Sequence, residues 1–217
     1  MIQLPSIMEA LDKLDRNKIA ERSILIRLLQ LCTSLNEQLF TWGEKLKTEV
    51  DHLYWTVPSV ADNPADDPVL GRIFPLAFQF PSLTIAQLLL LYWSALILLY
   101  STIQDIEKML RRQVASGTVT QHGFGLQVRD RSKICPELSC PSSDQIALLA
   151  NNICQSLEYC YHSKNGTFGP QSTIFPLWVA QSFYKSQSDR GQELAWCSEL
   201  GNMTAPDSRF DLYVMKL

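Results

Sequence analysis

Residues 166–180 read Gly166-Thr167-Phe168-Gly169-Pro170-Gln171-Ser172-Thr173-Ile174-Phe175-Pro176-Leu177-Trp178-Val179-Ala180. Glycine adopts backbone conformations that other residues resist, so Gly166 and Gly169 predict a sharp connection between two helices. We expect Pro170 to start the turn, Ser172 to cap the next helix, and Pro176 to lie in its first turn, where its missing amide costs little. The stretch therefore predicts a junction that docks helices onto a core.

The apolar residues in and after this stretch are expected to supply the packing surface of those helices: Phe175, Leu177, Trp178 and Phe183. Further along, Ala195-Trp196-Cys197 precedes Leu200, and Trp196 and Leu200 are four residues apart, which places them on one helical face. Nothing in this region has the pattern of a nucleophile elbow, a phosphate-binding loop or a metal site.

The middle of the chain contains an uncharged run from Ile73 to Gln104. Residues 83–103 are long enough to span a bilayer. However, Pro75 and Pro81 interrupt the front of the run, polar side chains such as Ser94 lie within it, and the flanking charges are of mixed sign. A helix that is apolar on all sides can also be the central helix of a bundle. We expect a buried core helix from Ser82, with a membrane span as the alternative.

Periodicity predicts further helices on both sides of this segment. Ser6-Ile7-Met8-Glu9 fits a capping box, so a first helix is expected to begin there. A second helix is expected from about Asn17 until residues 57–58, and its helical pattern is only weak beyond Leu39. Its expected inward face consists of Ile24, Leu28, Leu31, Leu35 and Leu39.

Helix caps and apolar periodicity also predict helices in the C-terminal part of the chain. Ser142 or Ser143 can cap a helix that Asn165-Gly166 ends, and further helices are expected from Ser172 and over residues 191–203. The expected inward stripe of the first of these helices is Ile146, Leu149, Ile153, Leu157 and Tyr161. We expect loops at 58–72 and 113–143.

Strand-like alternation is nearly absent, with Phe124–Val128 as the only weak candidate. The prediction is an all-α fold: one bundle-like domain over residues 1–217 with a buried, apolar central helix.

Charge and cysteine usage limit the function. The net charge is −3 and the sequence pI about 5.6, so the chain has no basic surface for phosphate backbones and is not expected to bind nucleic acid. Its first twenty residues contain no apolar signal core, so we expect an intracellular protein, nuclear or cytoplasmic. The six cysteines form no Cys-x-x-Cys pair, so we expect reduced, mostly buried thiols and no metal or cofactor. They are Cys32, Cys135, Cys140, Cys154, Cys160 and Cys197.

The stretch 166–180, with the apolar segment that ends in Glu158-Tyr159-Cys160 and the later Ala195-Trp196-Cys197, resembles the C-terminal regulatory domain of fungal zinc-cluster transcription factors. The segment 70–75 and the central helix add to the likeness, which covers roughly residues 20–210. The resemblance implies an all-α regulatory domain. Members of that family carry an N-terminal cluster of six cysteines that binds zinc and reads DNA. Here Cys32 is the only cysteine before residue 135, so DNA binding by this chain is not expected.

The function that the resemblance implies is regulation of transcription, often of a secondary-metabolite gene cluster. The expected mechanism is contact with a protein partner of the transcription machinery or with a small apolar metabolite between helices; a homodimer is also open. The alternative is a small all-α biosynthetic enzyme, of cyclase or isomerase type, that acts on an apolar intermediate in an interhelical pocket. Whether the chain is an enzyme stays open, with the non-enzymatic interpretation favoured.

The candidate catalytic residues for that alternative are Glu158 and His162, which are four residues apart and could share a helix face. A solvated or hydrogen-bonded pair near a helix end, where a cationic histidine is also stabilised, is the favoured interpretation of these two residues. Aspartates in the loop 58–72 could suggest magnesium but fit a charged surface loop better; they are Asp62, Asp66 and Asp67. His52 and His122 are isolated.

Overall fold

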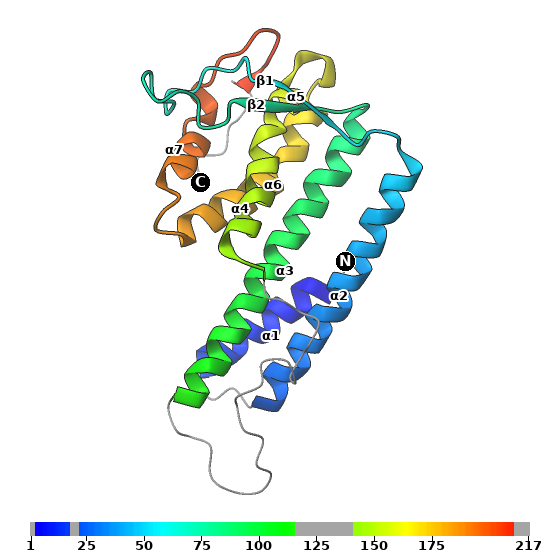
Figure 1. Ribbon diagram of the computed structural model, residues 1–217, viewed down its shortest axis with the longest axis vertical. Coiled ribbons are helices and arrows are strands. Elements are labelled where there is room, and N and C mark those ends of the chain that lie inside the picture. The colour runs from blue at the N-terminus through cyan, green and yellow to red at the C-terminus, as the bar shows by residue number, and fades with distance from the viewer. Residues whose placement is uncertain (1–2, 18–21, 116–140, 211–217) are drawn as a thin grey trace, which may run out of the picture. The chain divides into compact units, whose positions relative to one another are not determined.

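The computed structural model of the chain describes residues 3–17, 22–115 and 141–210 and divides into two compact units. Unit 1 comprises residues 1–41 and 99–142, and unit 2 comprises residues 42–98 and 143–217. Two long helices, α2 (Arg22–Glu49) and α3 (Leu83–Ala115), contribute to both units (Figure 1). Helices dominate both units, which confirms the all-α prediction. The single domain over 1–217 stays a prediction.

Unit 1 contains α1 (Gln3–Asn17), the first part of α2 and the last part of α3. The expected start of α1 at Ser6 is wrong by three residues, because Pro5 fits the first turn of a helix and does not stop it. Leu4, Ile7 and Leu11 are buried, as one face of an amphipathic helix should be.

The inward face of α2 differs from the expected one. Leu28 and Leu35 are buried as expected, but Ile24 and Leu31 are exposed. The buried side chains of the first part of α2 are Leu25, Leu28, Leu29, Cys32 and Leu35. The stripe is therefore rotated by one position, because a run with apolar residues on neighbouring positions fits two adjacent faces equally well.

The expected core helix is α3, and it runs about twelve residues beyond Ile103. Its charged last turns continue the helix with ion pairs from Lys108 to Asp105 (3.0 Å) and from Arg111 to Glu107 (2.7 Å). Within the described residues α3 is the one helix long and apolar enough to cross a membrane, yet 44% of its most apolar window is buried inside the protein. Ala86, Leu90, Ile97, Leu99, Ile103 and Ile106 are all buried.

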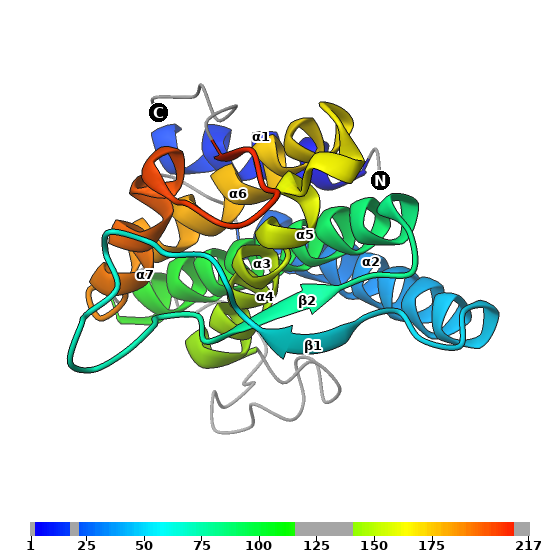
Figure 2. The same ribbon diagram turned by 90° about the horizontal axis from the view of Figure 1, so that it is seen from above.

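Unit 2 contains a short antiparallel hairpin of β1 (Trp55–Pro58) and β2 (Leu76–Gln79), with Trp55 opposite Gln79. β2 packs against α4 (Ser143–Gln155) and α5 (Leu157–Tyr161) (Figure 2). The sequence pattern does not predict this hairpin. Each strand has only four residues, too few to show alternation; β1 ends in Pro58, and β2 lies between Pro75 and Pro81. The candidate strand at 124–128 lies outside the described residues.

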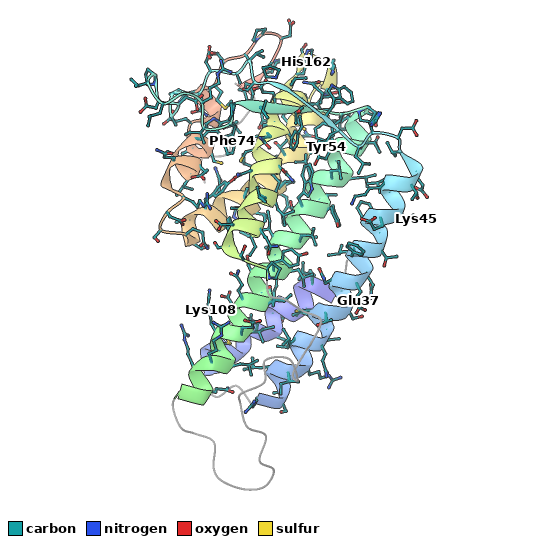
Figure 3. All side chains as sticks on the ribbon, viewed as in Figure 1. Glu37, Lys45, Tyr54, Phe74, Lys108 and His162 are labelled. Atoms are coloured by element: carbon teal, nitrogen blue, oxygen red, sulfur yellow. The ribbon has the colours of Figure 1, made fainter. Side chains whose placement is uncertain are left out.

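Aromatic rings join the hairpin to the helices of unit 2. Tyr54 lies 4.4 Å from Phe78 and 5.8 Å from Trp93 of α3, measured between ring centroids. Phe80 makes an edge contact with Tyr159 of α5 at 5.1 Å. Figure 3 labels Tyr54 at this cluster. These contacts bury the inner face of the hairpin, so a two-stranded sheet that would be marginal alone is stable here.

The C-terminal helices are α4, α5, the 3-10 turn η2 (Ser163–Asn165), α6 (Phe168–Ser186), α7 (Gly191–Ser198) and the 3-10 turn η3 (Leu200–Asn202). The expected stripe is largely confirmed, since Ile146, Ile153, Leu157 and Tyr161 are buried. The expectation that the helix from Ser142 or Ser143 continues to Asn165-Gly166 is wrong, since α4 ends at Gln155 and α5 at Tyr161. Gly166 ends only the 3-10 turn η2, with a φ of 55°.

α6 packs against α4, α5 and α7, which confirms that the stretch 166–180 docks helices together. The expected start of this helix at Ser172 is wrong: α6 begins at Phe168, and Ser172 lies inside it with its hydroxyl donating to the Gly169 carbonyl. Pro176 is therefore in the helix interior, not in the first turn. The error arose because Pro170 fits the first helical turn as well as the turn before it.

Candidate functional site

Glu158 of α5 holds the segment that follows β1. Its carboxylate accepts a hydrogen bond from the Ser59 hydroxyl and two from backbone amides, those of Val60 and Ala61, each at 3.2 Å. Hydrogen bonds to a carboxylate are stronger than neutral ones. Glu158 therefore fixes a segment almost a hundred residues away in the chain, which is a structural role.

Arg72 continues this network on the other side of Ser59. Its guanidinium donates to the Ser59 carbonyl and to the Ser59 hydroxyl, and it forms an ion pair with Asp62 at 2.8 Å. Asp62 also exchanges backbone hydrogen bonds with Thr204. The network thus ties the loop at 59–72 to the C-terminal segment.

His162 has a different task. Its Nδ1 accepts a hydrogen bond from the backbone amide of Lys164 at 3.2 Å and so caps η2. His162 lies at the end of α5, where Figure 3 labels it. Among the described residues, Glu158 and His162 share neither a hydrogen bond nor an ion pair. The structure places both candidate catalytic residues in unit 2 without joining them.

The remaining aspartates of the loop stabilise its turns. Asp67 accepts from the backbone amides of Val69 (2.7 Å) and Leu70 (2.9 Å), and these bonds lower the pKa of its carboxyl. Asp66 accepts from the amide of Ile73. These aspartates thus hold the turns of the loop through its backbone amides.

Metal-ligand groups do not gather in the part of the chain that the structure describes: no cluster there has three or more histidine, cysteine, aspartate or glutamate side chains placed to hold an ion. His52 is exposed in the segment before β1. His122, Cys135 and Cys140 lie outside the described residues.

The described cysteines are all free and buried, as expected. Burial raises the pKa of Cys32 to about 11 and that of Cys160 to about 12. Cys154 of α4 and Cys197 of α7 touch, with 3.6 Å between their sulfur atoms. The contact with Cys154, together with burial, raises the pKa of Cys197 well above its ordinary value. The thiols of Cys32, Cys160 and Cys197 are therefore protonated at neutral pH.

A tyrosine completes this buried group. The hydroxyl of Tyr184 lies 3.8 Å from the Cys154 sulfur and donates to the side-chain carbonyl of Asn151 at 2.8 Å. Burial raises the pKa of Tyr184 well above its ordinary value. The protonated hydroxyl of Tyr184 and the protonated thiol of Cys197 supply no base or thiolate at neutral pH.

The outer face of α6 is apolar and exposed, contrary to the expectation that Phe175 and Trp178 pack in the core. Phe168 is 71% exposed, Phe175 46% and Trp178 43%, and Ile174 beside them is also exposed. Phe175 and Trp178 stack, with 6.2 Å between ring centroids and 24° between ring planes. We call these four residues the α6 face.

Comparisons of the chain with protein-family models, with curated proteins and with solved structures find no match.

The residues of the α6 face are apolar in the sequence, but periodicity does not predict that they are exposed. Both sides of this helix carry apolar residues, so periodicity assigns all of them to the core. The buried side is set instead by Gly169, Thr173, Leu177, Ala180 and Tyr184. Small residues at the start of that series bring α6 close to its neighbours, and the large rings remain on the other side.

Proposed function

We propose that the protein is a non-enzymatic regulator of transcription that acts through its α6 face on a protein partner of the transcription machinery. The resemblance of residues 166–180 and their surroundings to the regulatory domain of fungal zinc-cluster transcription factors gives the class of function. The proposal includes a role in a fungal secondary-metabolite gene cluster, in the nucleus or the cytoplasm, without direct binding of DNA.

The exposed, stacked pair of Phe175 and Trp178 is the observation that carries the proposal. Aromatic residues are enriched at the centres of protein interfaces, where charged residues are depleted. No charged residue occurs between Lys164 and Lys185, so the whole α6 face is neutral. A matching partner would offer an apolar, uncharged surface to this helix, because burying unpaired charge against it would cost free energy.

The roles of Glu158 and His162 argue against the enzymatic alternative. A general acid and base must reach the same reacting group. Here the oxygens of Glu158 receive three donors from residues 59–61, and His162 accepts from the backbone of its own turn. Each side chain is used to hold the fold.

The proposal is tested by deleting the gene and measuring the full set of transcripts. We expect a defined group of transcripts to change at least several-fold and to recover when the gene is restored. Unchanged transcripts would contradict the proposal. If purified protein instead converts an apolar intermediate, and Glu158→Gln or His162→Ala abolishes the conversion, the enzymatic alternative is correct.

A further inference from the structure

We propose that Cys154 and Cys197 are a site of reversible disulfide formation that links α4 to α7. This inference concerns a modification of the chain and does not depend on the proposed function. The two sulfur atoms are already in contact at 3.6 Å. A disulfide bond is about 2.0 Å long, so the sulfurs need to approach by only about 1.6 Å.

The surroundings favour pairing of these two thiols over any other pair that the structure describes. Cys154 and Cys197 contact each other, whereas no other described cysteine has a sulfur contact with a second cysteine. Cys160 is fully buried in the same unit and Cys32 is buried in unit 1. Because their sulfurs are in contact, Cys154 and Cys197 have a high effective concentration for each other. Cys160 and Cys32 lack this advantage, because no described cysteine sulfur contacts them.

Access to the pair requires a local opening, and α7 is the element suited to it. α7 has only eight residues and is followed by the 3-10 turn η3. Helices this short are marginal without tertiary packing. Opening of α7 exposes Cys197, restores the ordinary acidity of its thiol and allows oxidation.

The chemistry is exchange with a small disulfide such as glutathione disulfide. The thiolate of one cysteine attacks a sulfur of glutathione disulfide and forms a mixed disulfide, and one glutathione leaves and takes up the proton. The second cysteine then loses its proton and attacks the protein sulfur of the mixed disulfide, which releases the second glutathione. The protein loses two hydrogens and two electrons, and one glutathione disulfide becomes two glutathiones.

The product would tether two helices that both pack against α6. α6 packs against α4 and against α7, and it lies between Cys154 and Cys197 in the chain. The disulfide would close a loop that contains α5, η2 and α6, and so restrict the unfolding of this part of unit 2.

The experiment uses the full chain carrying Cys135→Ser and Cys140→Ser, which removes the two thiols outside the described residues. The protein is equilibrated with glutathione and glutathione disulfide, alone and in 8 M urea. Free thiols are then blocked and the peptides are mapped without reduction. We expect a bond between the peptides of Cys154 and Cys197, with an equilibrium constant at least tenfold larger in the folded chain than in urea.

Variants and controls make the test decisive. Cys154→Ala and Cys197→Ala should each abolish the intramolecular bond, whereas Cys160→Ala should leave it unchanged. The inference is overturned if the folded chain keeps both thiols reduced under conditions that oxidise it in urea, if it pairs Cys160 or Cys32 as readily, or if its equilibrium constant does not exceed that in urea.

Discussion

Gly169 of α6 lies directly against the backbone carbonyl of Cys160 in α5: a Cβ atom on Gly169 would be 1.9 Å from that oxygen and 2.9 Å from the Cβ of Asn165. A contact at this distance is a severe overlap. Gly169 is therefore required for the close approach of two helices. The same close approach turns one side of α6 inwards and leaves the α6 face outside.

Replacing Gly169 by alanine should destabilise the protein by at least about 2 kcal/mol, because the methyl group meets backbone atoms that cannot move without displacing α5. Gly191→Ala is the matched control: Gly191 starts α7, and nothing lies within 4 Å of its added Cβ. That variant should remain within about 1 kcal/mol of the parent. The free energy of unfolding from urea titrations measures both, and an equal effect of the two substitutions would refute the close-approach explanation.

Glu158→Gln should lower the free energy of unfolding by about 1.5–3 kcal/mol, because the neutral amide replaces a carboxylate that accepts three hydrogen bonds. Glu44→Gln is the control, since Glu44 forms an exposed ion pair with Lys47 in the same unit. Exposed pairs of this kind contribute at most about 0.5 kcal/mol. If Glu158→Gln lowers the free energy of unfolding no more than Glu44→Gln does, the carboxylate of Glu158 does not anchor residues 59–61.

Stability should fall as pH rises above 9, in part because of Cys160. Its pKa is raised from 9.0 to about 12 by burial, so above pH 9 the unfolded chain releases this proton while the folded chain retains it. One such thiol lowers the free energy of unfolding by about 1.4 kcal/mol for each pH unit between those two values.

The variant Cys160→Ala tests this pH dependence. The free energy of unfolding of this variant should fall less steeply with pH than that of the parent. The difference in free energy of unfolding between the two proteins should therefore shrink between pH 8.5 and 10.5 in reducing buffer. Other groups with raised pKa values, such as Cys32 and Tyr184, remain in both proteins and cancel in the comparison. A difference that stays constant with pH would contradict the assignment.

The sequence predicted the helices better than the contacts between them. The helix at 83–103 follows from an uncharged apolar run and the stripe from Ile146 to Tyr161 from local periodicity, and most of the stripe and one side of the helix are buried. The role of Glu158 could not be predicted in this way, because its partners at 59–61 are brought to it by the hairpin, which itself was missed. A strand of four residues is too short for its alternation of apolar and polar residues to predict it.

The two faces of α6 show the same limit. Leu177 and Trp178 are neighbours in the chain and both are apolar, yet one is fully buried and the other is 43% exposed. The close approach at Gly169 decides which side turns inwards, and this depends on the position of the Cys160 carbonyl. That carbonyl is nine residues earlier in the chain and on another helix, so hydropathy alone gives no indication of it.

Transcript levels in a strain whose only copy of the gene carries Trp178→Ser test the central claim most directly. Val69→Ser is the control, since Val69 is 90% exposed in the loop of the same unit and belongs to no helix. Surface substitutions of this kind change stability by about 0.5 kcal/mol or less, which thermal melting verifies. We expect Trp178→Ser to reproduce the transcript changes of the deletion strain and Val69→Ser to restore parental levels. Parental transcript levels with folded Trp178→Ser protein would contradict the claim that the protein acts through the α6 face.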